Sequence, residues 1–91
     1  LQEGFKSVLR EVVLGPHSPA NGKAILDLHF PRNTLIAMIE RNGRFLTPGG
    51  STVLEHGDKL LLVADNHAGM KQAHQIMGMP FTEEAEDVES E

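Results

Sequence analysis

Five histidines are the side chains in this sequence most able to bind a metal ion or to exchange a proton near neutral pH. A helix that clamps zinc places two histidines four residues apart, and no pair here has that spacing. His67 and His74 are seven residues apart, whereas His17, His29 and His56 lie in or near predicted loops. We therefore interpret the histidines as surface or capping residues, with a shared metal site or a pH sensor as the alternative. His56 is the best candidate for a histidine that contacts a ligand.

A nucleophile activated by a base is the second chemistry to consider. Ser18, His17 and Asp27 are residue types found in hydrolases, but no glycine-flanked nucleophile elbow surrounds the serine. The Gly49-Gly50 pair is not followed by the Lys-Ser/Thr of a phosphate-binding P-loop. The chain has no cysteine, which excludes cysteine nucleophiles, thiolate zinc sites and disulfides. We expect no catalytic residues and no enzyme activity.

The segment from Phe30 to Ile36 combines the groups that bind an anionic ligand with apolar surface. Arg32 can pair with a phosphate, Asn33 can hydrogen-bond, and Leu35 or Ile36 can form an apolar wall. The alternative interpretation is that Arg32 and Asn33 form an ordinary solvated turn.

Charge is distributed unevenly along the 91 residues. Residues 1–82 hold eight basic and seven acidic residues, a net of 8 − 7 = +1, and the other six of the thirteen acids lie in the last nine residues. This predicts a nearly neutral folded body followed by an acidic, flexible tail. An overall charge of −5 and only four aromatic residues argue against a nucleic-acid partner.

The length fits one domain with marginal stability, so self-association is expected. No apolar run approaches the roughly 18 residues of a membrane span, and no signal-peptide pattern opens the chain. Because the chain begins at Leu1 and not at Met, we expect it to be a fragment of a longer protein.

The elements predicted in the first half of the chain are a strand over 8–14, a helix over 18–28 and a hairpin over 34–47. Ser18 is the predicted cap of the helix, and Gly22 within it suggests that another backbone passes close by. Asn42-Gly43 marks the hairpin turn, with Arg41 and Arg44 beside it in water.

The first arm of this hairpin, Leu35 to Ile39, is apolar on both faces, as expected for a central strand covered on both sides. A buried strand over 59–64 follows, with Val53 and Leu54 returning to the core before it. Asp65 or Asn66 then caps a last helix whose inner face contains Met70, Ala73, His74 and Met77. The fold class is therefore α+β: a small, mostly antiparallel sheet with two helices, in the order strand-helix-strand-strand-strand-helix.

These residues resemble the TrkA-C domain, the C-terminal subdomain of regulators of potassium conductance. The resemblance covers about residues 5–78, and its most specific part is a proline-glycine loop, a Val-Leu pair and a Gly-Asp turn before a buried strand. The matching stretches are Ser18-Pro-Ala-Asn-Gly-Lys23, Leu28-His-Phe-Pro-Arg32, Ile39-Glu-Arg-Asn-Gly-Arg44, Pro48-Gly-Gly-Ser-Thr-Val-Leu-Glu-His-Gly-Asp58 and the strand to Ala64.

The resemblance implies a TrkA-C-like α+β domain, usually a homodimer, attached to the cytoplasmic side of a membrane transporter. It implies that residues 5–78 form the regulatory domain, between a linker at 1–4 and the acidic tail at 79–91. It also implies a nucleotide effector such as cyclic di-AMP in the cleft between two protomers, with no certain cofactor. The purine would then lie against Leu35 or Ile36.

The position of the domain before an acidic terminus favours a sodium or potassium/proton antiporter of the bacterial inner membrane as its host. The alternative is a ligand-free oligomerisation module of a transporter or of a potassium channel regulator.

Overall fold

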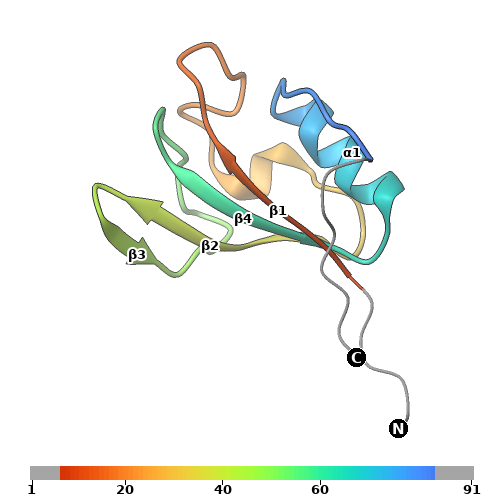
Figure 1. Cartoon of the computed structure of the whole chain (residues 1–91). Coiled ribbons are helices and arrows are strands. Elements are labelled where there is room, and N and C mark those ends of the chain that lie inside the picture. Colours follow the sequence, from red (N-terminus) through yellow and green to blue (C-terminus); the bar gives the residue numbers. More distant parts are fainter. Residues whose placement is uncertain (1–6, 84–91) are drawn as a thin grey trace, which may run out of the picture.

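Four antiparallel strands and one α-helix form the part of the chain that the structure describes, residues 7–83 of a computed structural model (Figure 1). The elements are β1 (Val8–Val13), a 3-10 turn η1 (Ile25–Leu28), β2 (Thr34–Arg41), β3 (Arg44–Leu46), β4 (Lys59–Ala64) and α1 (His67–Ile76). The strands form one sheet in the order β1-β4-β2-β3. Every neighbouring pair is antiparallel. The predicted α+β class is confirmed, as are the three long strands and the last helix.

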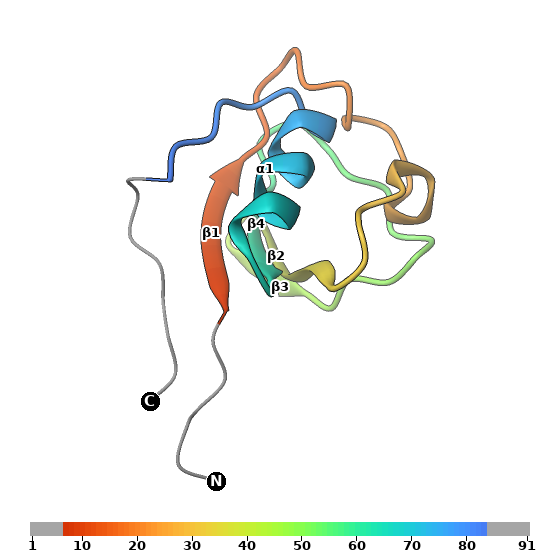
Figure 2. The ribbon, with the colours of Figure 1, turned by 90° about the vertical axis from the view of Figure 1, so that its right-hand side faces the viewer.

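The hydrophobic core lies between α1 and one face of the sheet. Figure 2 shows α1 on this side of the strands. Alternate side chains of β4, Leu60, Leu62 and Ala64, are buried there because side chains on a strand alternate between its two faces. The predicted inner face of the last helix is also confirmed: its four members, Met70, Ala73, His74 and Met77, are each no more than 4% exposed.

Local signals at both ends of α1 are those that the sequence indicates. The Asn66 side chain accepts a hydrogen bond of 2.8 Å from the Gly69 N–H and so caps the helix. Gly78 takes a φ of 71° directly after the helix, and the Met79 N–H then donates to the His74 carbonyl at 2.8 Å. The Asn42-Gly43 hairpin turn is confirmed as well, with φ angles of 53° and 77°.

The helix predicted over 18–28 is wrong, except for the four residues of η1. Within itself the segment makes only short-range turn bonds, such as that from the Asn21 N–H to Ser18 O at 3.2 Å. Other backbone groups bond to the loop before β4: the Gly22 N–H donates to Leu54 O at 2.7 Å, and the Ile25 N–H to Thr52 O at 2.9 Å. Ser18 still accepts from the Ala20 N–H, but its hydroxyl also donates to Met77 O at 2.8 Å. Long-range hydrogen bonds therefore replace the helical ones.

Another backbone passes close to Gly22, as predicted, because its N–H donates to Leu54 O at 2.7 Å. The glycine is not needed for space, however, because a Cβ atom built at this position would meet nothing within 4 Å. Its φ of 82° lies in the left-handed region that residues with a side chain rarely adopt. The turn therefore needs glycine for its backbone angle.

One face of the sheet is left open. β2 is central, between β4 and β3, yet Leu35 and Met38 on its outer side are 52% and 37% exposed. The expectation that this strand is covered on both sides is therefore wrong for a single copy of the chain. Val53 is also 46% exposed, so of the Val53-Leu54 pair only Leu54 returns to the core.

Candidate ligand-binding surfaces

The segment from Phe30 to Ile36 leads from η1 into the first residues of β2. Phe30 packs against the edge of the core, and Arg32 is exposed. Asn33 takes a φ of 62°, and its side-chain amide donates to an Asp65 carboxylate oxygen at 3.0 Å. The Asp65 N–H in turn donates to Asn33 O at 3.2 Å. Asn33 thus holds the start of β2 against the end of β4, whereas Arg32 makes no hydrogen bond or ion pair within residues 7–83.

The two apolar candidates of this segment face opposite sides of the sheet. Ile36 is 7% exposed and belongs to the core, whereas Leu35 is 52% exposed on the open face. Only Leu35 can therefore form the wall of a ligand site on the open face. A hollow of about 380 Å³ lies beside the segment, lined by His29, Pro31 and residues of α1.

His56 lies at the other end of the sheet. The Thr34 end of β2 pairs with Ala64, whereas the turn that contains His56 precedes Lys59 at the opposite end of β4. Within one copy of the chain, the structure does not bring His56 together with Arg32 and Leu35.

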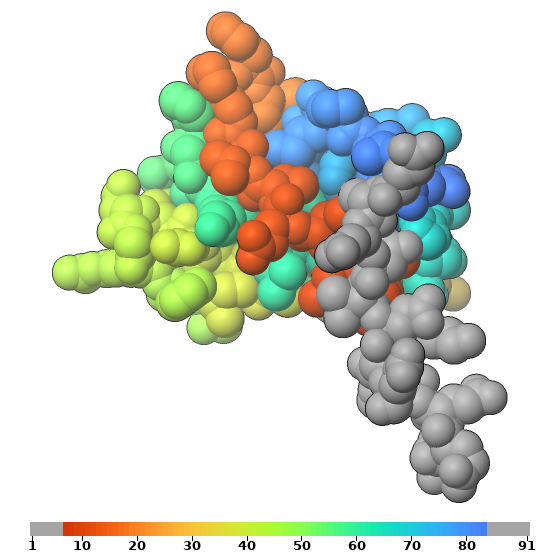
Figure 3. All heavy atoms as spheres, viewed as in Figure 1, coloured from red at the N-terminus to blue at the C-terminus, as the bar shows by residue number. Residues whose placement is uncertain are grey.

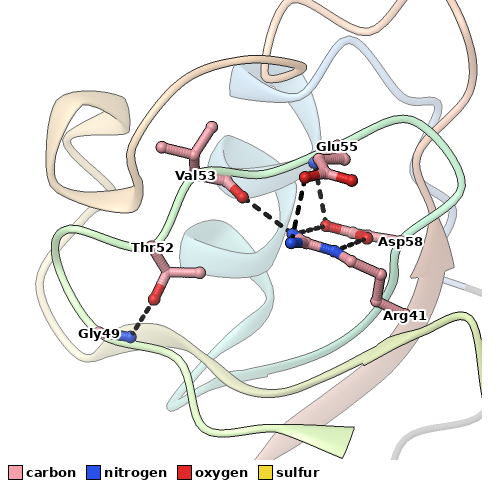
Figure 4. Close-up of polar contacts among 6 residues, drawn as sticks. All are labelled: Arg41, Gly49, Thr52, Val53, Glu55 and Asp58. Atoms are coloured by element: carbon pink, nitrogen blue, oxygen red, sulfur yellow. Dashed lines mark hydrogen bonds and ion pairs between the residues drawn. The ribbon is translucent and has the colours of Figure 1, made fainter. Parts of the chain in front are cut away.

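The turn that carries His56 is fixed by an ion pair that the sequence reasoning missed (Figure 4). The Arg41 Nε and Nη2 atoms donate to the two carboxylate oxygens of Asp58 at 2.8 and 2.7 Å, and Nη2 also donates to Val53 O at 2.9 Å. Arg41 Nη1 lies 3.2 Å from the Glu55 carboxylate. The prediction that Arg41 stands in water beside the hairpin turn is therefore wrong, because its side chain is only 23% exposed.

Opposing effects act on the pKa of Asp58. Burial raises it, but the hydrogen bonds from Arg41 and from the Glu55 N–H outweigh burial, so the pKa is lowered. The hydrogen bond to Asp58 likewise raises the pKa of Arg41. Both groups stay charged and paired, which makes this cluster a structural clamp and not an acid-base site.

A groove of about 560 Å³ lies between β1, the loop after it and residues 77–82. Figure 3 shows the surface of β1 directly beside the surface of this C-terminal segment. The Arg10 guanidinium lies 5.1 Å from the centre of the Phe81 ring and donates to Thr82 O at 3.3 Å. Met79 and Phe81 thus pack on the body, although the predicted acidic tail begins at residue 79.

His74 lies beneath this groove. Its Nδ1 atom is 2.8 Å from Met70 O, and its ring centre is 5.0 Å from that of Phe81. Burial lowers the pKa of His74, and the nearby charge of Arg10 lowers it further. Among residues 7–83, no three His, Asp or Glu side chains gather in a way that could hold a metal ion. In the same range, no helix has the length and apolar character needed to cross a bilayer.

Taken together, these features describe a small α+β domain with an open apolar sheet face and a guanidinium without a hydrogen-bond partner near one end of that face, within residues 7–83. The chain belongs to the TrkA-C domain family, whose model matches residues 9–77. Domains of this family are regulatory and not catalytic.

The chain is similar to part of two potassium uptake proteins. It is 39% identical over 79 residues to a Trk system potassium uptake protein TrkA homolog of Archaeoglobus fulgidus, covering 87% of this chain and 18% of that protein. It is 37% identical over 60 residues to the Trk system potassium uptake protein TrkA of Mycobacterium tuberculosis, covering 66% and 27%. The chain thus spans less than a third of the length of these relatives.

Solved structures share the fold. The RCK_C domain dimer of S. agalactiae BusR in complex with c-di-AMP matches with a TM-score of 0.65 and 24% identity, over 78% of this chain and 96% of that one. S. agalactiae BusR in complex with its busAB-promotor DNA matches with a TM-score of 0.59 and 28% identity, over 80% and 38%. The prediction that this chain binds no nucleic acid stays a prediction.

Proposed function

We propose that this TrkA-C domain is the cytoplasmic, ligand-sensing regulatory domain of a monovalent cation/proton antiporter of the bacterial inner membrane. It acts as a homodimer whose geometry shifts when a small nucleotide binds between two copies. A ligand shifts such an equilibrium only by its difference in affinity for the two arrangements. Family membership and the likeness to a c-di-AMP-bound RCK_C dimer support this proposal.

The observation that carries the ligand proposal is the unpaired Arg32 guanidinium three residues before the exposed Leu35 side chain. A phosphate can exchange its water for hydrogen bonds from Arg32, while a base covers Leu35. Cyclic di-AMP carries two phosphates and two bases related by a two-fold axis. A symmetric dimer supplies two copies of Arg32 and Leu35 related in the same way.

Isothermal titration with cyclic di-AMP tests this site. We expect Arg32→Ala to lose two charged hydrogen bonds per nucleotide, one from each copy and each worth about 1.5–3 kcal/mol, which weakens binding at least about a hundredfold. Lys71→Ala is the matched control, because Lys71 is an exposed cation on α1, and it should bind as the wild type does. Equal affinity of the Arg32→Ala variant would remove Arg32 from the site.

The second candidate is a ligand-free oligomerisation module, which the open apolar sheet face also favours. A thermal-shift panel of nucleotides separates the two: a ligand that binds only the folded state raises the melting temperature, whereas a pure scaffold responds to none. The host is tested by measuring sodium- and potassium-driven proton exchange in everted vesicles that contain the full-length protein, with and without the ligand. Uptake without proton exchange would contradict the antiporter assignment, whereas exchange that no nucleotide changes would contradict the ligand-sensing role.

A further inference from the structure

β1 lies at an edge of the sheet, and one side of it carries backbone groups that no other strand uses. Its neighbour is β4, and no strand among residues 7–83 lies on its other side. The Leu14 N–H donates to Asp58 O at 2.9 Å, and these two residues are opposite each other when the register of β1 and β4 is extended by one pair. Backbone groups of an antiparallel strand alternate between its two sides. The N–H and C=O groups of Leu9, Glu11 and Val13 therefore point away from β4.

Contacts of the Arg10 side chain agree with this orientation. Its Nη1 atom donates to Leu9 O at 3.2 Å, and its Nη2 atom donates to Thr82 O at 3.3 Å. Among residues 7–83, the backbone groups of Glu11 and Val13 have no hydrogen-bond partner on the side away from β4. Two donors and two acceptors thus face outward from this edge, at positions about 7 Å apart along the strand.

The groove of about 560 Å³ runs along this edge. Its lining includes the consecutive residues Arg10 to Val13. Consecutive side chains of a strand point to opposite faces of the sheet, so one cavity reaches all of them only from the edge. The opposite wall is the segment 77–82, which Figure 2 shows on the side of β1 away from β4. The volume is within the range of about 300–1,000 Å³ that is typical of ligand sites.

These features fit an extended peptide. A peptide that adds a strand to a sheet edge takes its affinity from main-chain hydrogen bonds and its specificity from pockets for alternate side chains. On the α1 side of the sheet, the added side chains would lie against Val12, Met79 and Phe81, which are partly buried and pack on the core. Apolar residues suit these positions of the peptide.

On the open face, the added side chains would lie beside Glu11. This carboxylate is exposed and has no ion-pair partner in the described part of the chain. Opposite charges on neighbouring strands stabilise a sheet, whereas like charges directly opposite each other destabilise it. Basic residues therefore suit these positions.

Charge also favours a basic peptide over a second copy of this chain. The wall of the groove ends at Thr82, and six carboxylates follow within the last nine residues of the sequence. Two copies that paired their β1 edges would each add this negative charge to one interface. The same charge attracts a basic partner.

We propose that the free edge of β1 and the groove beside it bind an extended segment of a partner protein, in which apolar and basic residues alternate. The segment adds a fifth strand to the sheet. Its backbone bonds to Glu11 and Val13, and its apolar side chains fill the groove. The inference rests neither on the homodimer nor on the nucleotide of the proposed function, since Arg32 and Leu35 do not line this groove.

Fluorescence anisotropy with a short synthetic peptide of alternating Val and Lys tests the chemistry of the occupant. A peptide of the same composition, with all Val before all Lys, is the control. We expect the alternating peptide to bind at least about tenfold more tightly, because only its strand has one apolar and one basic face. Equal affinities would overturn the assigned pattern.

Amide hydrogen exchange, followed by NMR, tests the place and the mode of binding. Saturation with the alternating peptide should slow the exchange of the Glu11 and Val13 N–H groups at least about tenfold, because each gains a hydrogen bond. The Phe45 N–H is the internal control. Arg41 and Arg44 pair across a two-residue turn, so the next residue on β3 points its N–H away from β2, at the other edge of the sheet.

A proline at each edge supplies the matched pair of variants. Val13→Pro removes an outward N–H and leaves the bonds between β1 and β4 in place, and we expect it to weaken peptide binding about tenfold. Phe45→Pro removes an outward N–H from β3 and should bind as the wild type does. Circular dichroism confirms that each variant folds. If Val13→Pro does not fold, the exchange experiment on the wild type still decides.

Each outcome bears on this edge alone. Unchanged exchange at Glu11 and Val13 in the saturated protein overturns the site, even if the peptide binds elsewhere. Equal peptide affinity of folded Val13→Pro and the wild type overturns it as well. If Val13→Pro dissociates a dimer in the absence of peptide, a second copy occupies the edge, which overturns the peptide assignment and leaves the homodimer of the proposed function standing.

Discussion

At the scale of single residues, the clamp between Arg41 and Asp58 shows what sequence reasoning could and could not find. The Gly57-Asp58 turn before a buried strand is visible in the sequence. The partner of Asp58 is not, because Arg41 is 17 residues away and meets it only when β2 and β4 pair. Arg10 is a similar case: it stands within an apolar run, and its contact with Phe81 exists only after residues 77–82 return to β1.

For His74 we predict that the protein loses folding stability in mild acid. Its folded pKa is lowered by burial, so below its unfolded pKa of about 6.5 the unfolded chain binds a proton that the folded chain does not. Stability should therefore be constant above this pH and fall as the pH drops from the unfolded toward the folded pKa. Each unit of difference between the two pKa values is worth about 1.4 kcal/mol.

Urea unfolding at several pH values between 7.5 and 5 measures this dependence. In His74→Gln the free energy of unfolding should fall less between pH 7.5 and 5 than it does in the wild type. This holds whatever the stability of the variant at pH 7.5. His56→Gln, on an exposed turn, is the control and should keep the wild-type decline. If the free energy of unfolding of His74→Gln falls as much as that of the wild type, another titrating group causes the pH dependence.

At the scale of elements, the sequence is most informative where a single element is specified by its own residues. The hairpin is set by Asn42-Gly43 and the last helix by its Asn66 cap and its apolar stripe, and both form as predicted. The segment 18–28 fails because its backbone is satisfied by the loop that ends at Leu54, a partner that no local pattern reveals. The same limit applies to the candidate site. The alternation of side chains along β2 already indicates that Leu35 and Ile36 face opposite sides of the sheet. That both lie far from His56 follows only from the register of β2 with β4.

Gly22→Ala tests the conformational explanation for this segment. We expect the free energy of unfolding to fall by about 1–2 kcal/mol, because the positive φ of 82° disfavours a Cβ although no atom blocks it. Gly15→Ala is the matched control: it also has open space around it, but its φ is not positive, so the change should stay within about 0.5 kcal/mol. Equal effects in chemical denaturation would refute the backbone-angle explanation.

At the scale of the whole molecule, the described residues leave one face of the sheet open, which fits the proposal that this domain acts as part of a larger assembly. The relatives point in this direction too, since the chain corresponds to 18% of the A. fulgidus TrkA homolog and to nearly all of the RCK_C chain of the BusR dimer. If Arg32 and Leu35 of both copies hold one nucleotide, dimerisation and ligand binding must be coupled. Coupling of this kind is reciprocal: the dimer binds the nucleotide more tightly, and the nucleotide tightens the dimer by the same factor.

This coupling gives two measurable numbers. Titration with cyclic di-AMP should saturate at one nucleotide per two chains, and sedimentation in the presence of the nucleotide should give a lower dimer dissociation constant than in its absence. The loss of nucleotide affinity in Arg32→Ala should persist in the fully dimeric protein. Saturation at one nucleotide per chain with an unchanged dimer constant would mean that each copy binds alone and that the cleft between copies is not the sensor.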